Sequence, residues 1–296
     1  MIWIIPAVFL LGLSAVLYWG AGVILHPPSM SAMEIFPESF GLGYEKIVFE
    51  TSDRLVLKGW FVPSANGKKD RTLLMCHGWS DNKGELLKMT AYLHAAGFNL
   101  FYFDFRSHGE SQGEFTTLGH YELQDLKAAM DCLRARKPWC LENLGIFGFS
   151  MGAAVAAMGA GDYPEIRAVV LESPFTEFHR VCAQWTKNHL HIPYFPMVMG
   201  AIFVLRLRAG LAVGSKSPVN SISRISPKPL LMIGGSADTL MPESGVRRLY
   251  AAAGEPKQLW IIPGAAHGKC HETAGLAYER RVIGFFEKHL LPATRA

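Results

Sequence analysis

Short apolar runs alternate with helical patterns along most of this chain of 296 residues. Two runs with alternating faces, Tyr44 to Glu50 and Leu55 to Val62, are separated by Thr51-Ser52-Asp53 and predict an antiparallel hairpin at a sheet edge. Six continuous apolar runs follow, of the kind buried on both faces of a parallel sheet. They are Arg71 to Cys76, Asn99 to Phe105, Asn143 to Phe149, Ala168 to Glu172, Pro229 to Ile233 and Gln258 to Ile262.

Helical patterns lie between these runs. They are Glu85 to Ala95, Leu118 to Arg134, Met151 to Gly159, Glu243 to Ala253 and Glu272 to His289. The alternation predicts an α/β class with a mostly parallel eight-stranded sheet and helices on both faces. The interval from Phe175 to Arg224 is too long for a simple crossover, so we predict a small helical cap there, over the carboxyl ends of the strands.

The stretch from Ile2 to Leu25 carries no charged side chain. As a helix it would cover ~36 Å, more than the ~30 Å hydrocarbon core of a bilayer, and Tyr18 and Trp19 suit a membrane interface. We therefore expect a single-pass transmembrane anchor over residues 1–26, with a cleaved signal peptide and a buried core helix as the alternatives. Because Lys46 is the first basic residue after it, the side of the membrane stays open.

The rest of the chain divides into a linker over residues 27–43 and one domain over residues 44–292, with the cap at about 175–224. Apolar residues make up 50% and charged residues 18%, which excludes a disordered protein. The net charge of +4 is spread without a basic block, so we predict no nucleic-acid partner. The oligomeric state is not predicted.

The cysteine count of five is odd and contains no CxxC pair. We interpret the cysteines as small buried side chains, with one disulfide, such as Cys132 to Cys140, as the alternative. Since no spacing is typical of a zinc site, we predict no metal and no cofactor.

The segment Gly148-Phe149-Ser150-Met151-Gly152 lies between an apolar run and a helix of small residues. A serine on a tight strand-to-helix turn has strained backbone angles and close neighbours, so the chemistry needs small residues at 148 and 152. This nucleophile elbow predicts that Ser150 is presented to a cleft as a catalytic nucleophile.

A serine hydroxyl needs a base, and the base needs an orienting carboxylate. His267, in a Gly/Ala loop after the last predicted strand, is the candidate base, and His271 is its rival. Asp238, in the Gly/Ser loop after the preceding strand, is the candidate acid, with Glu172 as the alternative. The order Ser, Asp, His along the chain is the one expected for this arrangement.

An oxyanion needs backbone N–H donors. Met151, directly after the nucleophile, would supply one, and Trp79 in His77-Gly78-Trp79-Ser80 the other. We expect His77 itself to brace this loop by hydrogen bonds.

These motifs together resemble the serine hydrolases of the α/β-hydrolase superfamily over about Tyr44 to Leu290. The ordered signatures are His77 to Ser80, Asp104 to Ser111, Gly148 to Gly152, Gly235 to Asp238 and Ala266 to Gly268. The resemblance is greatest to the membrane-anchored branch called serine aminopeptidase-like or prolyl-oligopeptidase-like, and it implies the α/β-hydrolase fold. It also implies that Asp104 to Ser111 is a structural loop beside the active site, although Ser107 stands where the family commonly has glycine.

The expected activity is cleavage of a small-molecule ester or thioester through an acyl-enzyme. A serine aminopeptidase is the alternative, but it needs an acidic patch for a substrate amine, and the cap holds only Glu177. A catalytically silent, membrane-tethered scaffold would have lost Ser, His or Asp, and none is lost. Asp or Cys at position 150 would have indicated a dehalogenase or a dienelactone hydrolase.

The apolar stretch Pro193 to Leu211 in the cap has two interpretations. It packs on the core, or it lies over Ser150 with Phe203 and Leu205 in an acyl pocket. In the second case Arg206 and Arg208 would reach lipid headgroups.

Overall fold

The computed structural model describes residues 4–26, 33–67, 71–210 and 212–290, and in these residues eight strands form one sheet in the order β1-β2-β4-β3-β5-β6-β7-β8. The strands are β1 (Glu45–Glu50), β2 (Val56–Val62), β3 (Thr72–Cys76), β4 (Asn99–Phe103), β5 (Leu144–Phe149), β6 (Ile166–Glu172), β7 (Leu230–Gly235) and β8 (Lys257–Ile262). The β1–β2 hairpin is antiparallel and forms one edge, and β2 joins β4 antiparallel, whereas β3 to β8 pair in parallel. The predicted mostly parallel sheet with a hairpin at its edge is confirmed.

The helices follow the predicted alternation. They are α1 (Ile4–Leu25), α2 (Lys83–Thr90), α3 (Tyr92–Ala95), α4 (Glu122–Arg136), α5 (Met151–Gly159), α6 (Phe178–Leu190), α7 (Met199–Ala209), α8 (Pro218–Ser221), α9 (Glu243–Ala252), α10 (Cys270–Ala274) and α11 (Leu276–His289), with short turns η1 (Pro37–Phe40), η2 (Pro138–Leu141), η3 (Ala160–Asp162), η4 (Tyr194–Val198) and η5 (Ile222–Ile225). Two expected helices are each divided, the first at Ala91 between α2 and α3, and the second at Gly275, with φ +52°, between α10 and α11.

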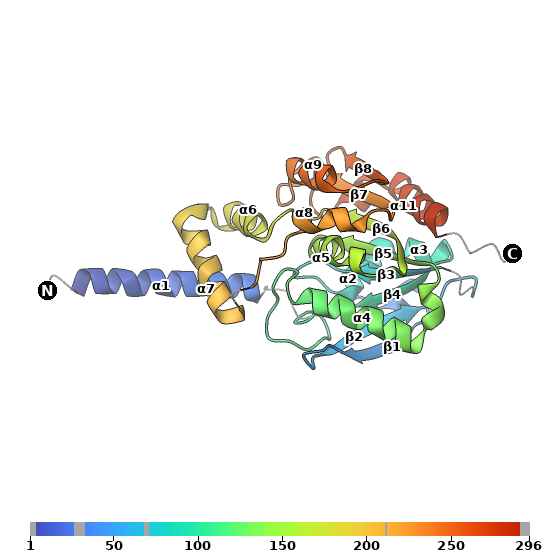
Figure 1. Ribbon diagram of the computed structural model, residues 1–296, viewed down its shortest axis with the longest axis horizontal. Helices are drawn as coiled ribbons and strands as arrows, with labels where there is room; N and C mark the ends of the chain where they lie inside the picture. Colours follow the sequence, from blue (N-terminus) through green and yellow to red (C-terminus); the bar gives the residue numbers. More distant parts are fainter. Residues whose placement is uncertain (1–3, 27–32, 68–70, 211, 291–296) are drawn as a thin grey trace.

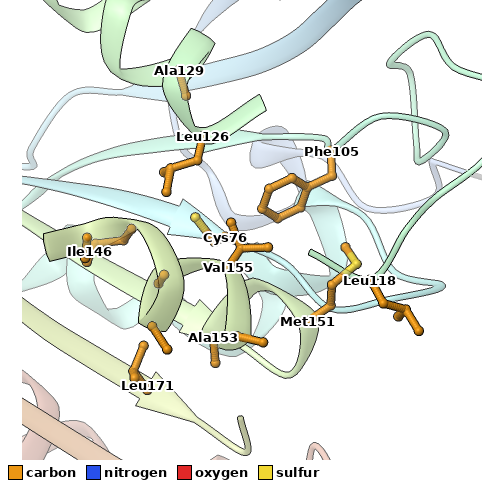
Figure 2. Close-up of a cluster of buried hydrophobic side chains, with 14 of the residues drawn as sticks. Cys76, Phe105, Leu118, Leu126, Ala129, Ile146, Met151, Ala153, Val155 and Leu171 are labelled. Carbon is orange, nitrogen blue, oxygen red and sulfur yellow. The ribbon is translucent and has the colours of Figure 1, made fainter. Parts of the chain in front are cut away.

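Helices cover both faces of the sheet (Figure 1). One core contains side chains of α4, α5 and α9, and Figure 2 shows the part of it where Leu126 and Val155 meet Cys76 and Ile146 of the sheet. The core on the opposite face contains side chains of α2, α3 and α11. Burying both faces explains why the six central strands are continuous apolar runs rather than alternating ones.

Helix α1 projects from the domain, but its last turns are built into it (Figure 1). Ala21 and Leu25 are buried, and the Leu25 carbonyl accepts a hydrogen bond from the Thr116 N–H at 2.9 Å. Helix α7 crosses α1 closely, since a Cβ on Gly200 would lie 2.9 Å from the Leu17 side chain. The N-terminal helix and the cap therefore pack as one unit.

Among the described residues, no single helix has both the length and the apolar character needed to cross a membrane. The apolar stretch that qualifies as a shorter helix runs from Leu10 to Leu25 and covers ~24 Å, less than the ~30 Å of a hydrocarbon core. Helix α6 and the segment Tyr194–Ala209 are long and apolar enough to cross a membrane only when taken together, and the pair is bent by 113°. The predicted transmembrane anchor is thus not supported. Ile2 lies outside the described residues, as do residues 27–32 of the predicted linker.

A buried ion pair fixes the loop after β4 to the start of α2. The Lys83 side chain is fully buried, and its ammonium lies between Asp104 and Glu110 and 4.5 Å from the Trp60 ring centroid. Asp104 also accepts from the backbone N–H groups of Lys83, at 2.8 Å, and Glu110, at 2.9 Å. Removing the lysine charge would leave a buried carboxylate without its counter-ion.

We predict that Lys83→Met lowers the free energy of unfolding by about 3 to 5 kcal/mol, because the buried Asp104 carboxylate loses the cation that pairs with it. The matched control is Lys127→Met, which breaks the exposed pair with Asp131 and should cost less than about 0.5 kcal/mol. Urea denaturation of the two variants measures both values. Equal losses would show that the Lys83 pair does not stabilise the fold.

Candidate active site

Ser150 occupies the sharp turn between β5 and α5 with φ +52°, in the left-handed region that few non-glycine residues adopt. A Cβ on Gly148 would lie 2.5 Å from the Gly152 carbonyl oxygen. A Cβ on Gly152 would lie 2.1 Å from the Cys76 carbonyl oxygen. Neither position has room for a side chain, which is the reason the sequence analysis gave for these glycines.

The structure brings His267 and Asp238 to this serine. His267, in the loop after β8, has its Nε2 3.1 Å from Ser150 Oγ and its Nδ1 2.8 Å from Asp238 Oδ2. The other carboxylate oxygen of Asp238 accepts from the backbone N–H groups of Leu240 and Met241, so the carboxylate is held in place. An ionised carboxylate only accepts, so Nδ1 carries the ring proton and Nε2 is left to accept the serine proton.

Neither the His271 nor the Glu172 side chain, the two alternatives from the sequence, is hydrogen-bonded to the side chain of Ser150 or His267. His271 Nε2 lies 3.0 Å from Glu279, and its ring stacks on Tyr92. Glu172 is fully buried, and its carboxylate accepts from the Tyr278 hydroxyl. Burial raises the pKa of Glu172. The geometry therefore favours Asp238 over Glu172 as the partner of the imidazole.

The two expected oxyanion donors lie beside the serine. Met151 is the first residue of α5, where backbone N–H groups have no partner within the helix. A Cβ built on Gly78 would lie 3.5 Å from the Ser150 Cβ, so the loop that carries Trp79 passes directly beside the nucleophile. Trp79 itself lines the cavity at Ser150 and packs against Trp185.

Two buried histidines brace the loop His77-Gly78-Trp79-Ser80. His77 Nδ1 lies 2.7 Å from the Gly78 carbonyl, and its Nε2 accepts from the Phe105 N–H at 2.9 Å. His108 repeats the pattern, with Nδ1 2.7 Å from the Arg106 carbonyl and Nε2 accepting from the Ser80 N–H at 3.2 Å. Burial lowers the pKa of both imidazoles, which keeps them neutral. The sequence analysis assigned this role to His77 but missed His108, whose only signal was the Asp104 to Ser111 motif.

Ser107 has φ +60°, so the position where the family commonly has glycine is one that requires the left-handed region. The serine adopts this conformation with its N–H donating to the Gln112 carbonyl at 3.0 Å. The loop therefore keeps its turn despite the substitution.

A cavity of about 290 Å³ opens at Ser150 and His267. Helix α6 supplies one wall with Val181, Cys182 and Trp185, and the last turns of α1 supply another. Within the expected cap, it is therefore α6, and not α7, that lines the cavity at Ser150. The acyl-pocket residues proposed in α7 are wrong, because Phe203 is 60% exposed and Leu205 is buried in the core, and neither lines this cavity.

Asp81 is the one acidic residue among the described residues that line this cavity. Its carboxylate accepts from the Asn82 N–H at 3.0 Å and from the Gly78 N–H. Burial raises the pKa of Asp81 to about 7. Glu177, the acid noted in the cap, pairs instead with Arg180 and Arg248.

All five cysteines lie within the described residues, are buried and form no disulfide, so the alternative of a Cys132–Cys140 disulfide is wrong. In the described part of the chain, no cluster of three His, Cys, Asp or Glu side chains could hold a metal ion.

Comparison with known proteins agrees with this fold. The sequence model of the family described as "Serine aminopeptidase, S33" matches residues 67–197. The uncharacterized protein YfhR of Escherichia coli is 32% identical over 254 residues, which are 84% of this chain and 82% of YfhR. WAV2 of Arabidopsis thaliana, an alpha/beta hydrolase domain-containing protein, is 26% identical over 270 residues, 89% of this chain and 85% of WAV2.

A solved structure is similar over nearly the whole chain. The esterase Pf2001 of Pyrococcus furiosus superposes with a TM-score of 0.74 at 26% identity, covering 90% of this chain and 98% of that one. The fold is therefore that of an α/β hydrolase. This chain belongs to the α/β-hydrolase superfamily, in the family that includes YfhR.

The geometry predicts that Ser150→Ala abolishes labelling by a fluorophosphonate probe, which reacts with activated serines. Removal of the base in His267→Ala should slow labelling on the order of 10² to 10⁴ fold. Asp238→Asn should slow it on a similar scale, since an amide favours the wrong imidazole tautomer. Mass spectrometry of the labelled peptide locates the adduct.

The matched control for the acid is Glu172→Gln, which keeps an acceptor for Tyr278 and should label at nearly the wild-type rate. If Glu172→Gln labels more slowly than Asp238→Asn, the orienting acid is Glu172.

Proposed function

We propose that this protein is a serine hydrolase that cleaves carboxylic esters or thioesters through an acyl-enzyme. The observation that carries the proposal is the hydrogen-bonded row from Asp238 through His267 to Ser150 at the base of a mainly apolar cavity. Similarity to the Pyrococcus furiosus esterase Pf2001 supports it.

In the first half-reaction Ser150 Oγ attacks the carbonyl carbon of the ester, and its proton passes to His267 Nε2. The developing oxyanion is stabilised by the backbone N–H groups of Met151 and Trp79. The bond to the leaving alkoxide or thiolate then breaks, and His267 returns the proton to that group. Water, deprotonated by the same imidazole, cleaves the acyl-serine and restores the enzyme, so no cofactor is needed.

The surroundings of Asp81, the acidic residue among the described residues that line the cavity, favour an ester over an aminopeptidase substrate. A substrate α-amine needs a free carboxylate, but Asp81 is occupied by backbone N–H donors of its own loop. The remaining walls are mainly aliphatic and aromatic. Such a cavity suits an uncharged acyl group.

A panel of p-nitrophenyl acyl esters, an acyl thioester and an aminoacyl p-nitroanilide tests the proposal. We expect the acyl esters or the thioester to give the highest kcat/KM, and Ser150→Ala to reduce turnover to background. Preferential cleavage of the aminoacyl anilide would show that the protein is a peptidase.

We further propose that the protein associates with membranes through α1 and α7. An i, i+4, i+8 stripe of α7, Met199, Phe203 and Leu207, is exposed. Met199 and Phe203 surround a shallow hollow together with Leu17 of α1. The Arg208 guanidinium lies 4.3 Å from the Tyr18 ring centroid, and a basic group beside an aromatic ring is typical of helices at a lipid interface.

A vesicle flotation assay tests this association. The wild type should float with vesicles of mixed neutral and anionic lipids, and Phe203→Asp with Leu207→Asp should lower the bound fraction at least about tenfold, because two exposed apolar side chains lose their transfer into lipid. The matched control is Leu276→Asp, at an equally exposed leucine on α11. Equal binding of the double variant and the control would disprove attachment through α7.

A further inference from the structure

The N-terminal helix forms part of the wall of the cavity that contains Ser150. Val23 and Ile24, in the last two turns of α1, face this cavity opposite Val181 and Trp185 of α6. These residues lie more than 120 positions before Ser150 in the sequence. The last turns of α1 are held by the contacts with α7 and by the hydrogen bond from Thr116.

A second, narrow hollow of about 30 Å³ lies next to this cavity along α1. Val23, Ile24 and Trp185 line both spaces, so the two adjoin at these three side chains. The second hollow extends between α1 and the cap helices, past Leu190 and Ala201.

The residues of α1 that line the second hollow lie on one face of the helix. Val16, Gly20 and Val23 are spaced i, i+4 and i+7, which places them in a row along the axis. At ~1.5 Å per residue, this row is ~10 Å long. The hollow is therefore a groove that runs lengthwise along α1.

The groove has no charged lining residue among those described, and Thr186, the one hydroxyl-bearing residue there, donates to the Cys182 carbonyl at 2.7 Å. A peptide or a sugar would bring polar groups that find no partner in such a space. A linear hydrocarbon chain has no polar group that would be left without a partner there. The apolar lining of the groove therefore favours a hydrocarbon chain as its occupant.

We infer that the groove along α1 is the distal part of an acyl-binding site, so that the substrates are esters of linear long-chain fatty acids whose chain passes from Ser150 beside Val23 to Val16. This inference rests on the proposed ester hydrolysis and names its substrate class. It also makes α1 a part of the substrate site.

Two tryptophan substitutions block the groove at successive points. Val23→Trp fills the junction next to the Ser150 cavity, and Val16→Trp fills the far end. The matched control is Leu11→Trp, which adds the same ring to the same helix at a side chain that is 71% exposed and lines neither space. Because Val16 is 43% exposed, its variant is compatible with folding and carries the test if Val23→Trp does not fold.

The measurement is kcat/KM of the full chain on p-nitrophenyl esters from acetate to palmitate. In the wild type we expect kcat/KM to rise with chain length by up to about fourfold per methylene that enters the site. Val23→Trp should lower the ratio of the long-chain to the acetate value at least about tenfold, with the loss beginning at medium chain lengths. Val16→Trp should lower it only for the longest chains, and Leu11→Trp should match the wild type.

The outcomes separate this inference from the proposed function. If the wild type cleaves esters but both Val variants keep the wild-type chain-length profile, the acyl site does not follow α1 and the inference is overturned. The same holds if Val16→Trp affects shorter chains than Val23→Trp does. If the wild type is labelled by a fluorophosphonate at Ser150 yet cleaves none of the esters, the proposed ester hydrolysis itself is wrong.

Discussion

The close contact between the start of α5 and the end of β3 is the constraint on which the site depends. The Gly152 backbone lies against the carbonyl groups of Cys76 and His77, with no space for a side chain. This contact fixes the first turn of α5, and with it Met151, relative to the loop that carries Trp79. This packing of backbone on backbone thus sets the position of Ser150 and Met151 relative to the loop of Gly78 and Trp79. In the proposed mechanism, oxyanion donors held by backbone packing would not have to reorganise during the reaction.

Buried polar groups hold the loops around that contact. A neutral imidazole has one N–H donor and one acceptor, and His77 and His108 each use them on one carbonyl and one backbone N–H. Burial keeps both rings neutral by lowering the pKa of each imidazole. The Lys83 ammonium holds the start of α2 against the loop after β4, because it compensates the charge of the buried Asp104 carboxylate. Because each group is buried with its partners, a different position of the loop that carries Trp79 would leave buried polar groups unsatisfied.

The apolar cap and α1 link two surfaces with different roles. Outward, exposed apolar side chains of α7 and the Arg208 and Tyr18 pair form the surface proposed to meet lipid. Inward, Val23 and Trp185 line the space that begins at Ser150. The same two segments therefore shape both the proposed membrane contact and the proposed acyl site. A substrate that partitions into lipid would find the catalytic serine close to the surface on which it resides.

The strands, the turn at Ser150 and the order Ser, Asp, His along the chain could all be predicted from the sequence, because each depends on a local pattern. Runs such as Leu144–Phe149 are apolar throughout only when both faces of a strand are covered, and glycines at 148 and 152 indicate a turn whatever surrounds it. Only the tertiary structure favours Asp238 over Glu172 and His267 over His271, since both comparisons depend on distances between segments far apart in the chain. It also decided which helix lines the cavity. Hydropathy is the same for an apolar residue exposed to lipid, packed on a neighbouring helix or lining a substrate groove, so the role of α1 followed only from its contacts.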